Sequence, residues 1–154
     1  MFAQIYENIH RQLKGLELLE ELQKEEFDLL TRRDAAAVSA LEFSIHELLR
    51  QLAVERDDLK QVMGNTLLRE YAEMLPPEDG AKVTDILVAM DKVEQRCARQ
   101  AELNSALSLT LLDTSHELMN CLYQQVQPKQ YSVYGAKGSY TVHRPQASLI
   151  SGRL

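Results

Sequence analysis

The sequence predicts an all-α protein, an antiparallel bundle of three long helices with a short connecting helix and an irregular C-terminal arm. Leucine, isoleucine and valine recur at three- and four-residue spacing over most of the chain, as on one face of a helix. Short polar, glycine- or proline-containing stretches interrupt this spacing. After Pro128 it stops, and Tyr, Gly, Ser and Pro become frequent. We therefore expect two parts, a helical bundle over residues 1–127 and an arm over residues 128–154.

The first helix is expected from near Phe2 to about Arg32. Its apolar face is formed by Ile5, Ile9, Leu13, Leu16, Leu19, Leu22 and Leu30. Gly15 interrupts this face, where glycine costs about 1 kcal/mol relative to alanine. Arg32 and Arg33 suit the end of the helix, because the helix dipole favours cations there.

The second helix is expected to begin after Asp34, a residue type that caps helix N-termini, and to end at Gly64. Its heptad seam consists of Val38, Leu41, Ile45, Leu48, Leu52, Leu59 and Val62, with Glu55 in place of one apolar member. The connection at Arg32–Asp34 is very short, so helices one and two should form an antiparallel hairpin.

A short helix should follow, capped by Asn65 or Thr66 and stopped by Pro76 and Pro77. The third long helix is then expected from 78–81 to about Val126, before Pro128. Its seam carries Val83, Ile86, Met90, Val93, Cys97, Leu107, Leu111, Leu118 and Cys121.

Some seam positions hold polar residues, namely Glu55, Gln100, Asn104 and Thr114, of which the first three are the most informative. Such residues can fix the register or the choice of partner helix at a cost in stability. Alternatively, the helices diverge there and the side chains meet water. The sequence leaves both interpretations open.

Charge is divided unevenly along the chain. Residues 1–127 carry a net charge of −10, whereas residues 128–154 carry four cations and no acid. An acidic body argues against nucleic acid as the main ligand. The apolar runs are too short to span a bilayer, and the N-terminus lacks the pattern of a signal peptide, so we expect a cytoplasmic protein without membrane insertion.

Motifs that would carry catalysis or a cofactor are weak. Glu7 and His10 have the spacing of a di-iron ligand pair, but the pair occurs once where such sites need two. Cys97 and Cys121 would lie about 36 Å apart on one helix, too far to pair, and are expected as half-buried thiols. We expect no enzyme, no metal and no cofactor.

The last turns of the third long helix carry more apolar residues than one stripe needs. These are Leu107, Leu109, Leu111, Leu112, Leu118, Leu122 and Tyr123. A helix that is apolar on more than one side usually packs against more than one partner. Either the C-terminal arm covers the additional surface or another protein does.

The chain resembles the FlgN family of flagellar type III export chaperones. The resemblance rests on LLEELQKEEFDLLTRRDAAAVSALEFSIHELLRQLAVERDDL, on the segment around Asn104, and on YGAKG after the terminal proline, and it covers about residues 10–140. It implies a cytoplasmic chaperone that binds the helical C-terminal ends of hook-filament junction proteins and docks to a component of the export gate.

By position, the resemblance implies that the helix from Leu107 to Tyr123 faces the cargo, and Tyr134 matches the tyrosine of the Tyr-Gly-x-x-Gly motif. The predicted protein-binding residues are Leu107, Leu111, Leu112, Leu118, Leu122, Tyr123, Tyr131 and Tyr134. The alternative is a coiled-coil scaffold protein that associates with itself, with a homodimer as its simplest form.

Overall fold

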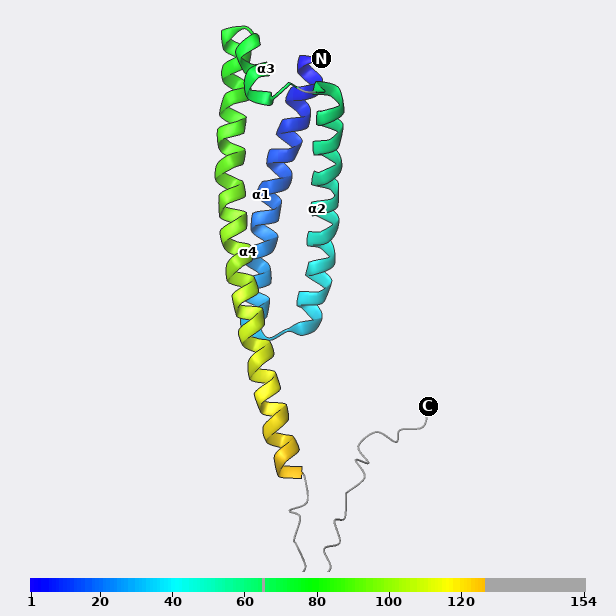
Figure 1. The fold of residues 1–154 in the computed structure, drawn as a ribbon, viewed down its shortest axis with the longest axis vertical. Helices are drawn as coiled ribbons and strands as arrows, with labels where there is room; N and C mark the ends of the chain where they lie inside the picture. Colours follow the sequence, from blue (N-terminus) through cyan, green and yellow to red (C-terminus); the bar gives the residue numbers. More distant parts are fainter. Residues whose placement is uncertain (65, 127–154) are drawn as a thin grey trace, which may run out of the picture. The chain divides into compact units, whose positions relative to one another are not determined.

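The computed structural model describes residues 1–64 and 66–126. Four helices follow one another along the chain: α1 (Phe2–Arg32), α2 (Ala35–Met63), α3 (Leu68–Met74) and α4 (Pro77–Val126). Three long helices and one short helix pack as a bundle, so the predicted fold class is confirmed. Figure 1 shows α2 returning antiparallel to α1 and α4 running in the direction of α1.

The hydrophobic core lies in the unit formed by Met1–Leu111. It is built from apolar side chains of all four helices: Ile5, Ile9, Leu16, Leu19, Leu52, Leu59, Ala72, Val83, Ile86, Met90, Val93 and Cys97. Every one of the α1 and α4 members lies on a face that the three- and four-residue spacing predicted. On α2, however, only Leu52 and Leu59 are buried, and both lie in its second half.

The turn between α1 and α2 is closed at both helix ends. Arg33 adopts the left-handed conformation (φ 58°, ψ 33°), and the backbone N–H of Asp34 donates to the oxygen of Leu29 at 3.1 Å. The Asp34 carboxylate accepts from the N–H of Ala37 at 3.1 Å, which confirms the predicted N-cap of α2. At the other end of α2, Gly64 has a φ of 62°, as its predicted C-cap role requires.

The start of α3 differs from the prediction. Its N-cap is Leu67, whose N–H donates to the Glu70 carboxylate at 3.2 Å, so the prediction that Asn65 or Thr66 caps this helix is wrong. The acceptor is the side chain of Glu70, three residues after the N-cap, because the apolar side chain of Leu67 cannot accept a hydrogen bond. Leu75 follows α3 in an extended conformation, and α4 begins directly at Pro77, slightly earlier than predicted. Proline suits a first helical position, because its missing N–H has no partner there.

Two glycines allow backbone segments to approach closely. A Cβ atom on Gly15 of α1 would lie 2.7 Å from Cδ2 of Leu52 in α2. A Cβ atom on Gly80 of α4 would lie 2.5 Å from the backbone oxygen of Ala72 in α3. The glycine in the first helix, which the sequence alone marks as a weak point, is therefore the place where α1 and α2 pack tightly.

The polar seam residue of α2 joins two helices. Glu55 accepts a hydrogen bond from Nδ2 of Asn8 at 2.6 Å and from Nε of Arg11 at 2.8 Å. Arg11 lowers the pKa of the Glu55 carboxyl through this hydrogen bond and its charge. Gln12 adds a buried hydrogen bond to Asn8 at 2.7 Å. Glu55 thus contacts α1, which supports the interpretation that it fixes the register of the hairpin.

A second polar group joins α4 to α1. The Asn104 side chain, 4% exposed, donates from Nδ2 to the backbone oxygen of Gln23 and to Oε2 of Glu26, each at 2.7 Å. Gln100 donates to Oδ1 of Asn104 at 2.9 Å. The interpretation that the helices diverge at these positions is therefore wrong for Asn104.

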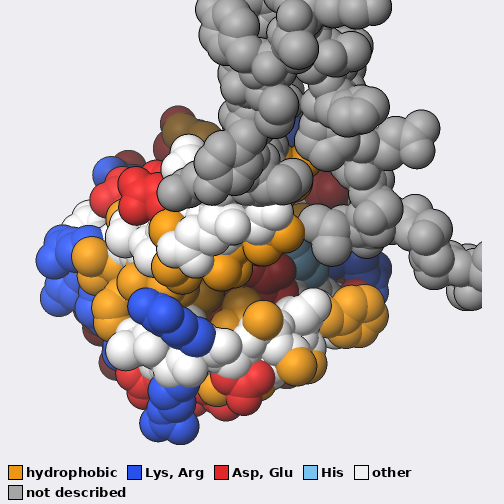
Figure 2. All heavy atoms as spheres, turned by 90° about the horizontal axis from the view of Figure 1, so that it is seen from below, with side chains coloured by type: hydrophobic (Ala, Val, Ile, Leu, Met, Phe, Trp, Pro, Cys, Tyr) orange, Lys and Arg blue, Asp and Glu red, His pale blue; other side chains and the backbone are white. Residues whose placement is uncertain are grey.

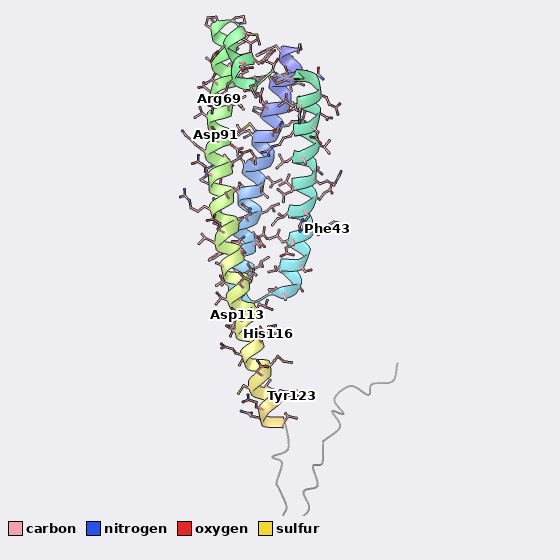
Figure 3. All side chains as sticks on the ribbon, viewed as in Figure 1. Phe43, Arg69, Asp91, Asp113, His116 and Tyr123 are labelled. Carbon is pink, nitrogen blue, oxygen red and sulfur yellow. The ribbon has the colours of Figure 1, made fainter. Side chains whose placement is uncertain are left out.

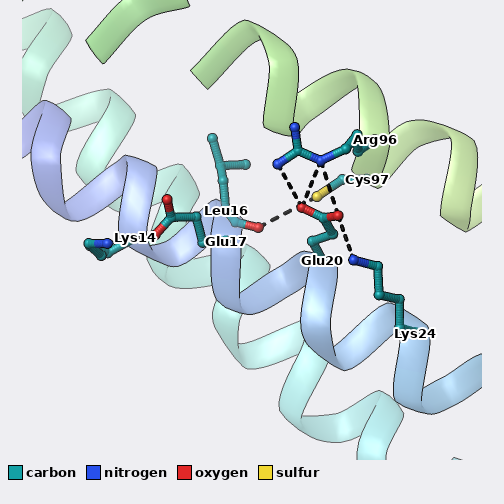
Figure 4. Close-up of polar contacts among 7 residues, drawn as sticks. All are labelled: Lys14, Leu16, Glu17, Glu20, Lys24, Arg96 and Cys97. Carbon is teal, nitrogen blue, oxygen red and sulfur yellow. Dashed lines mark hydrogen bonds and ion pairs between the residues drawn. The ribbon is translucent and has the colours of Figure 1, made fainter. Parts of the chain in front are cut away.

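A cluster of ion pairs joins α1 and α4 near the middle of their contact. Glu20 lies between Arg96 and Lys24, and its carboxylate accepts from both, at 2.9 Å and 2.7 Å (Figure 4). These hydrogen bonds, Arg96 first, lower the pKa of Glu20 to about 2. Beside them, the thiol of Cys97 lies 3.5 Å from the oxygen of Leu16, and burial raises its pKa. The charged groups of Glu20, Arg96 and Lys24 thus lie at the edge of the core, and the buried Cys97 thiol stays protonated.

A second unit starts at Leu112 and contains the remainder of α4. The described residues of this unit, 112–126, are helical throughout. The predicted division into 1–127 and 128–154 stays a prediction, because it falls at the edge of the described residues.

Candidate functional site

The candidate site lies at the end of α4, where the predicted protein-binding residues differ in exposure. Leu107 and Leu111 are half-buried within the unit that holds the core. Leu112, Leu118, Leu122 and Tyr123 are all more than half exposed, with Leu118 at 57%. Tyr131 and Tyr134 lie outside the described residues.

The exposed apolar residues form two neighbouring rows on the helix. One row consists of Leu112, Met119, Tyr123 and Val126, separated by seven, four and three residues. The second consists of Leu118 and Leu122, separated by four residues. Positions at these spacings lie on one side of a helix, and the two rows are adjacent, so they form a continuous surface. We call these six residues the apolar face of α4; Figure 3 labels Tyr123 near its end.

Met119 and Val126 are members that the sequence analysis missed. Both are more than 60% exposed. Neither lies on the heptad frame that the core residues define, and the sequence analysis followed that frame. Counting every apolar residue on the helix circumference, rather than those in the frame, would have found them.

The charged residues of this part of α4 have one sign. From Gln100 to Val126, α4 contains no Lys or Arg, and its acids are Glu102, Asp113 and Glu117. In the view of Figure 2, hydrophobic side chains reach the molecular surface among charged ones. An exposed apolar surface on an acidic helix segment is suited to an amphipathic partner that carries basic residues.

The residues tested for metal or redox chemistry lie apart from this face. Glu7 is exposed, and the exposed His10 ring stacks on Tyr6 with centroids 6.4 Å apart. Among residues 1–64 and 66–126, no group of three or more His, Cys, Asp or Glu side chains is arranged to hold a metal. Cys97 is buried and Cys121 is exposed, so the expectation of two half-buried thiols is wrong for both.

Comparison with known protein families decides the identity of the chain. The family model described as FlgN protein matches residues 1–141. The chain belongs to the FlgN family. No curated protein and no solved structure matches it.

Membership confirms the resemblance seen in the sequence. FlgN proteins are cytoplasmic, non-enzymatic chaperones that serve the export of flagellar hook-associated proteins, and binding of hook-filament junction proteins follows for this chain. Within the described part of this FlgN protein, no helix has the length and hydrophobicity to cross a membrane.

Proposed function

We propose that this FlgN protein binds the helical C-terminal ends of hook-filament junction proteins through the apolar face of α4 and keeps them unassembled before export. The observation that carries the proposal is the two adjacent rows of exposed apolar side chains. A single row of exposed apolar residues would be typical of a helix that packs against one neighbouring helix. Two rows expose enough apolar surface to receive an amphipathic helix.

The acidic character of this helix segment adds a criterion for the cargo. Asp113 and Glu117 give the segment a negative field, which favours the approach of a partner helix that carries Lys or Arg. Exposed charge pairs of this kind are screened by salt. Cargo binding should therefore keep most of its affinity at high salt, because apolar burial dominates, while the association rate should fall.

The experiment is calorimetric titration of the full chain with a synthetic peptide of a junction protein's C-terminal helix. Leu118→Glu places a charge in the second row and should weaken binding by about 1–3 kcal/mol or more, as for anchor residues at interfaces. Asn120→Glu is the matched control, since Asn120 is exposed on α4 outside both rows. Equal affinity of both variants, with native circular dichroism, would refute the proposal. Leu111→Ala tests separately the half-buried Leu111, a predicted binding residue in the unit Met1–Leu111.

We also propose that residues 128–154, with Tyr131 and Tyr134, take part in docking to the export gate. Tyrosine can bury apolar area and keep a hydroxyl for a polar partner, and the cations of this segment distinguish it from the acidic remainder. A pull-down with the full chain and with a chain truncated at Gln127 separates the two roles. Loss of gate components with retained cargo supports the proposal, and loss of cargo alone contradicts it.

A homodimer would use the same exposed rows, so cargo and a second copy would compete. Light scattering at micromolar concentration, with and without the cargo peptide, measures this directly. A stable oligomer that does not respond to the peptide would favour the self-associating scaffold over the chaperone mode of binding.

A further inference from the structure

A second open surface lies within the unit Met1–Leu111, between α2 and α4. The two helices are joined by an ion pair between Arg56 and Glu94. On α2, the stripe that contains Arg56 continues toward the N-terminus as Leu49, Ile45 and Val38, at spacings of seven, four and seven. Leu49 is 44% exposed, whereas Val38 and Ile45 are half-buried and Ile45 packs partly against the core.

The matching stripe of α4 is made of small residues. It starts at Glu94 and continues as Ala98, Ala101, Ser105 and Ser108, at spacings of four, three, four and three. All four are exposed. Because α2 and α4 are antiparallel, both stripes extend in the same direction from the ion pair (Figure 1). We call these seven residues the α2–α4 face.

The dimensions of this face suit a helix. Val38 is eighteen residues from Arg56, and Ser108 is fourteen from Glu94. At about 1.5 Å per residue, the stripes are about 21–27 Å long, the length of a helix of about 14–18 residues. Small side chains on one helix allow a neighbouring helix to approach closely, and the aliphatic side chains on the other supply apolar contact.

A buried acceptor in the same part of the bundle has no donor. Oε1 of Gln23, on α1, is buried and has no hydrogen-bond partner among the described residues. The backbone oxygen of Gln23 accepts a hydrogen bond from the side chain of Asn104, and Asn104 lies three residues after Ala101 on α4. A buried acceptor without a donor is unfavourable, so this part of the bundle contains a polar group that its own packing leaves unsatisfied.

The charge of the α2–α4 face identifies the occupant. Glu42 lies beside the α2 stripe and Glu102 beside the α4 stripe, and neither residues 35–49 nor residues 100–108 contain Lys or Arg. A second copy in symmetric contact would bring like charges together. The chain's own residues 128–154 are basic, but two prolines and three glycines disfavour a helix there. A foreign amphipathic helix with basic flanks fits both the shape and the charge.

We propose that the cargo helix docks on the α2–α4 face in addition to the apolar face of α4. This inference rests on the proposed function, since it takes the same cargo as the occupant. It adds a second contact surface and a requirement on the cargo, namely Lys or Arg beside an aliphatic stripe.

The test uses the full chain and the same junction-protein peptide. Ala101→Trp and Ser105→Trp each place a bulky side chain on the α2–α4 face and should weaken the Kd by about tenfold or more, in the range of interface anchors. Ala106→Trp is the matched control, because Ala106 is exposed on the opposite side of α4, and should leave the Kd unchanged. Circular dichroism verifies the fold of each variant.

A charge-reversal pair gives a second measurement that needs no bulky side chain. Glu42→Lys with Glu102→Lys should weaken peptide binding by several-fold at low salt and less at high salt, whereas Glu21→Lys on α1 should not. A photo-crosslinking residue at position 101 then identifies what lies there. A crosslink to the peptide supports the inference, and a crosslink to a second copy or to residues 128–154 overturns it.

The outcomes separate this inference from the proposed function. If Leu118→Glu weakens binding and the tryptophan and charge-reversal variants do not, the α2–α4 face is refuted and the proposed function stands. If none of these variants changes the Kd, both are refuted.

Discussion

Asn104 of α4 and Gln23 of α1 are joined by a hydrogen bond of 2.7 Å from the Asn104 side chain to the Gln23 backbone oxygen. The same amide group also donates to Glu26, so one side chain ties α4 to two positions of α1. Shifting α4 by one turn would bury these groups without partners. We infer that Asn104 specifies how α4 is positioned along α1, as polar seam residues do in coiled coils.

Replacing Asn104 by alanine should destabilise the fold. Asn104→Ala removes all three side-chain hydrogen bonds, to Gln23, Glu26 and Gln100, at a cost of about 1–3 kcal/mol. Urea unfolding followed by circular dichroism measures the change. Ser105→Ala, at the exposed neighbouring position, is the control and should change stability by less than about 0.5 kcal/mol. Equal stability of the two variants would contradict the role assigned to Asn104.

The sequence predicted the helices and their inward faces well, because helix periodicity is a local property. It could not predict how many neighbours cover each face. Val38 and Leu41 continue the same heptad frame as Leu52 and Leu59, yet only the latter two are buried. Burial at a seam position depends on where the neighbouring helices lie, and a single helix does not encode that.

Buried amides were the other feature that sequence alone concealed. Asn8 and Gln12 are buried and bonded to each other, although residues of this type are usually exposed. Their partner Glu55 is forty-seven residues away from Asn8, so no local pattern connects them. At the candidate site, the surplus of leucines predicted an exposed apolar surface, but the spacing of the leucines does not encode what covers it.

The close contact of α3 and α4 predicts an unusual glycine effect. Alanine normally stabilises a helix by about 1 kcal/mol relative to glycine. At position 80, however, its Cβ would lie 2.5 Å from the backbone oxygen of Ala72, so Gly80→Ala should destabilise by about 1–3 kcal/mol.

Gly15→Ala is the matched control for this prediction. Its Cβ would meet the flexible end of the Leu52 side chain, which can move, so the loss should be smaller. Thermal unfolding of both variants makes the comparison. A Gly80→Ala protein that is more stable than the unmodified chain would show that α3 shifts without cost.

The two thiols should react at very different rates. Cys121 is exposed on α4, whereas Cys97 is buried and its pKa is raised by that burial, which disfavours the reactive thiolate. Labelling with a thiol reagent at neutral pH should therefore modify one cysteine rapidly and the second only after denaturant is added. Cys121→Ser should abolish the rapid phase. Rapid labelling that persists in this variant would contradict the burial of Cys97.

The Glu20 cluster predicts how stability depends on acid. The hydrogen bonds from Arg96 and Lys24 lower the pKa of Glu20 from its usual 4.5 to about 2 in the folded state. The unfolded chain therefore takes up the proton first as pH falls. The contribution of Glu20 to stability is fully present above about pH 4.5 and is lost as pH falls toward 2. Its size should be about 1 kcal/mol, because both cations are half exposed and screened by water.

Glu20→Gln isolates this contribution, since the other acidic groups titrate alike in both proteins. The free energies of unfolding of the two proteins should differ by a constant amount from pH 7 to about pH 5 and converge as the pH approaches 2. Glu21→Gln, at the exposed neighbouring position, is the control and should show no such convergence. A difference between Glu20→Gln and the unmodified chain that stays constant down to pH 2 would mean that the carboxylate is not held by Arg96 and Lys24 in solution.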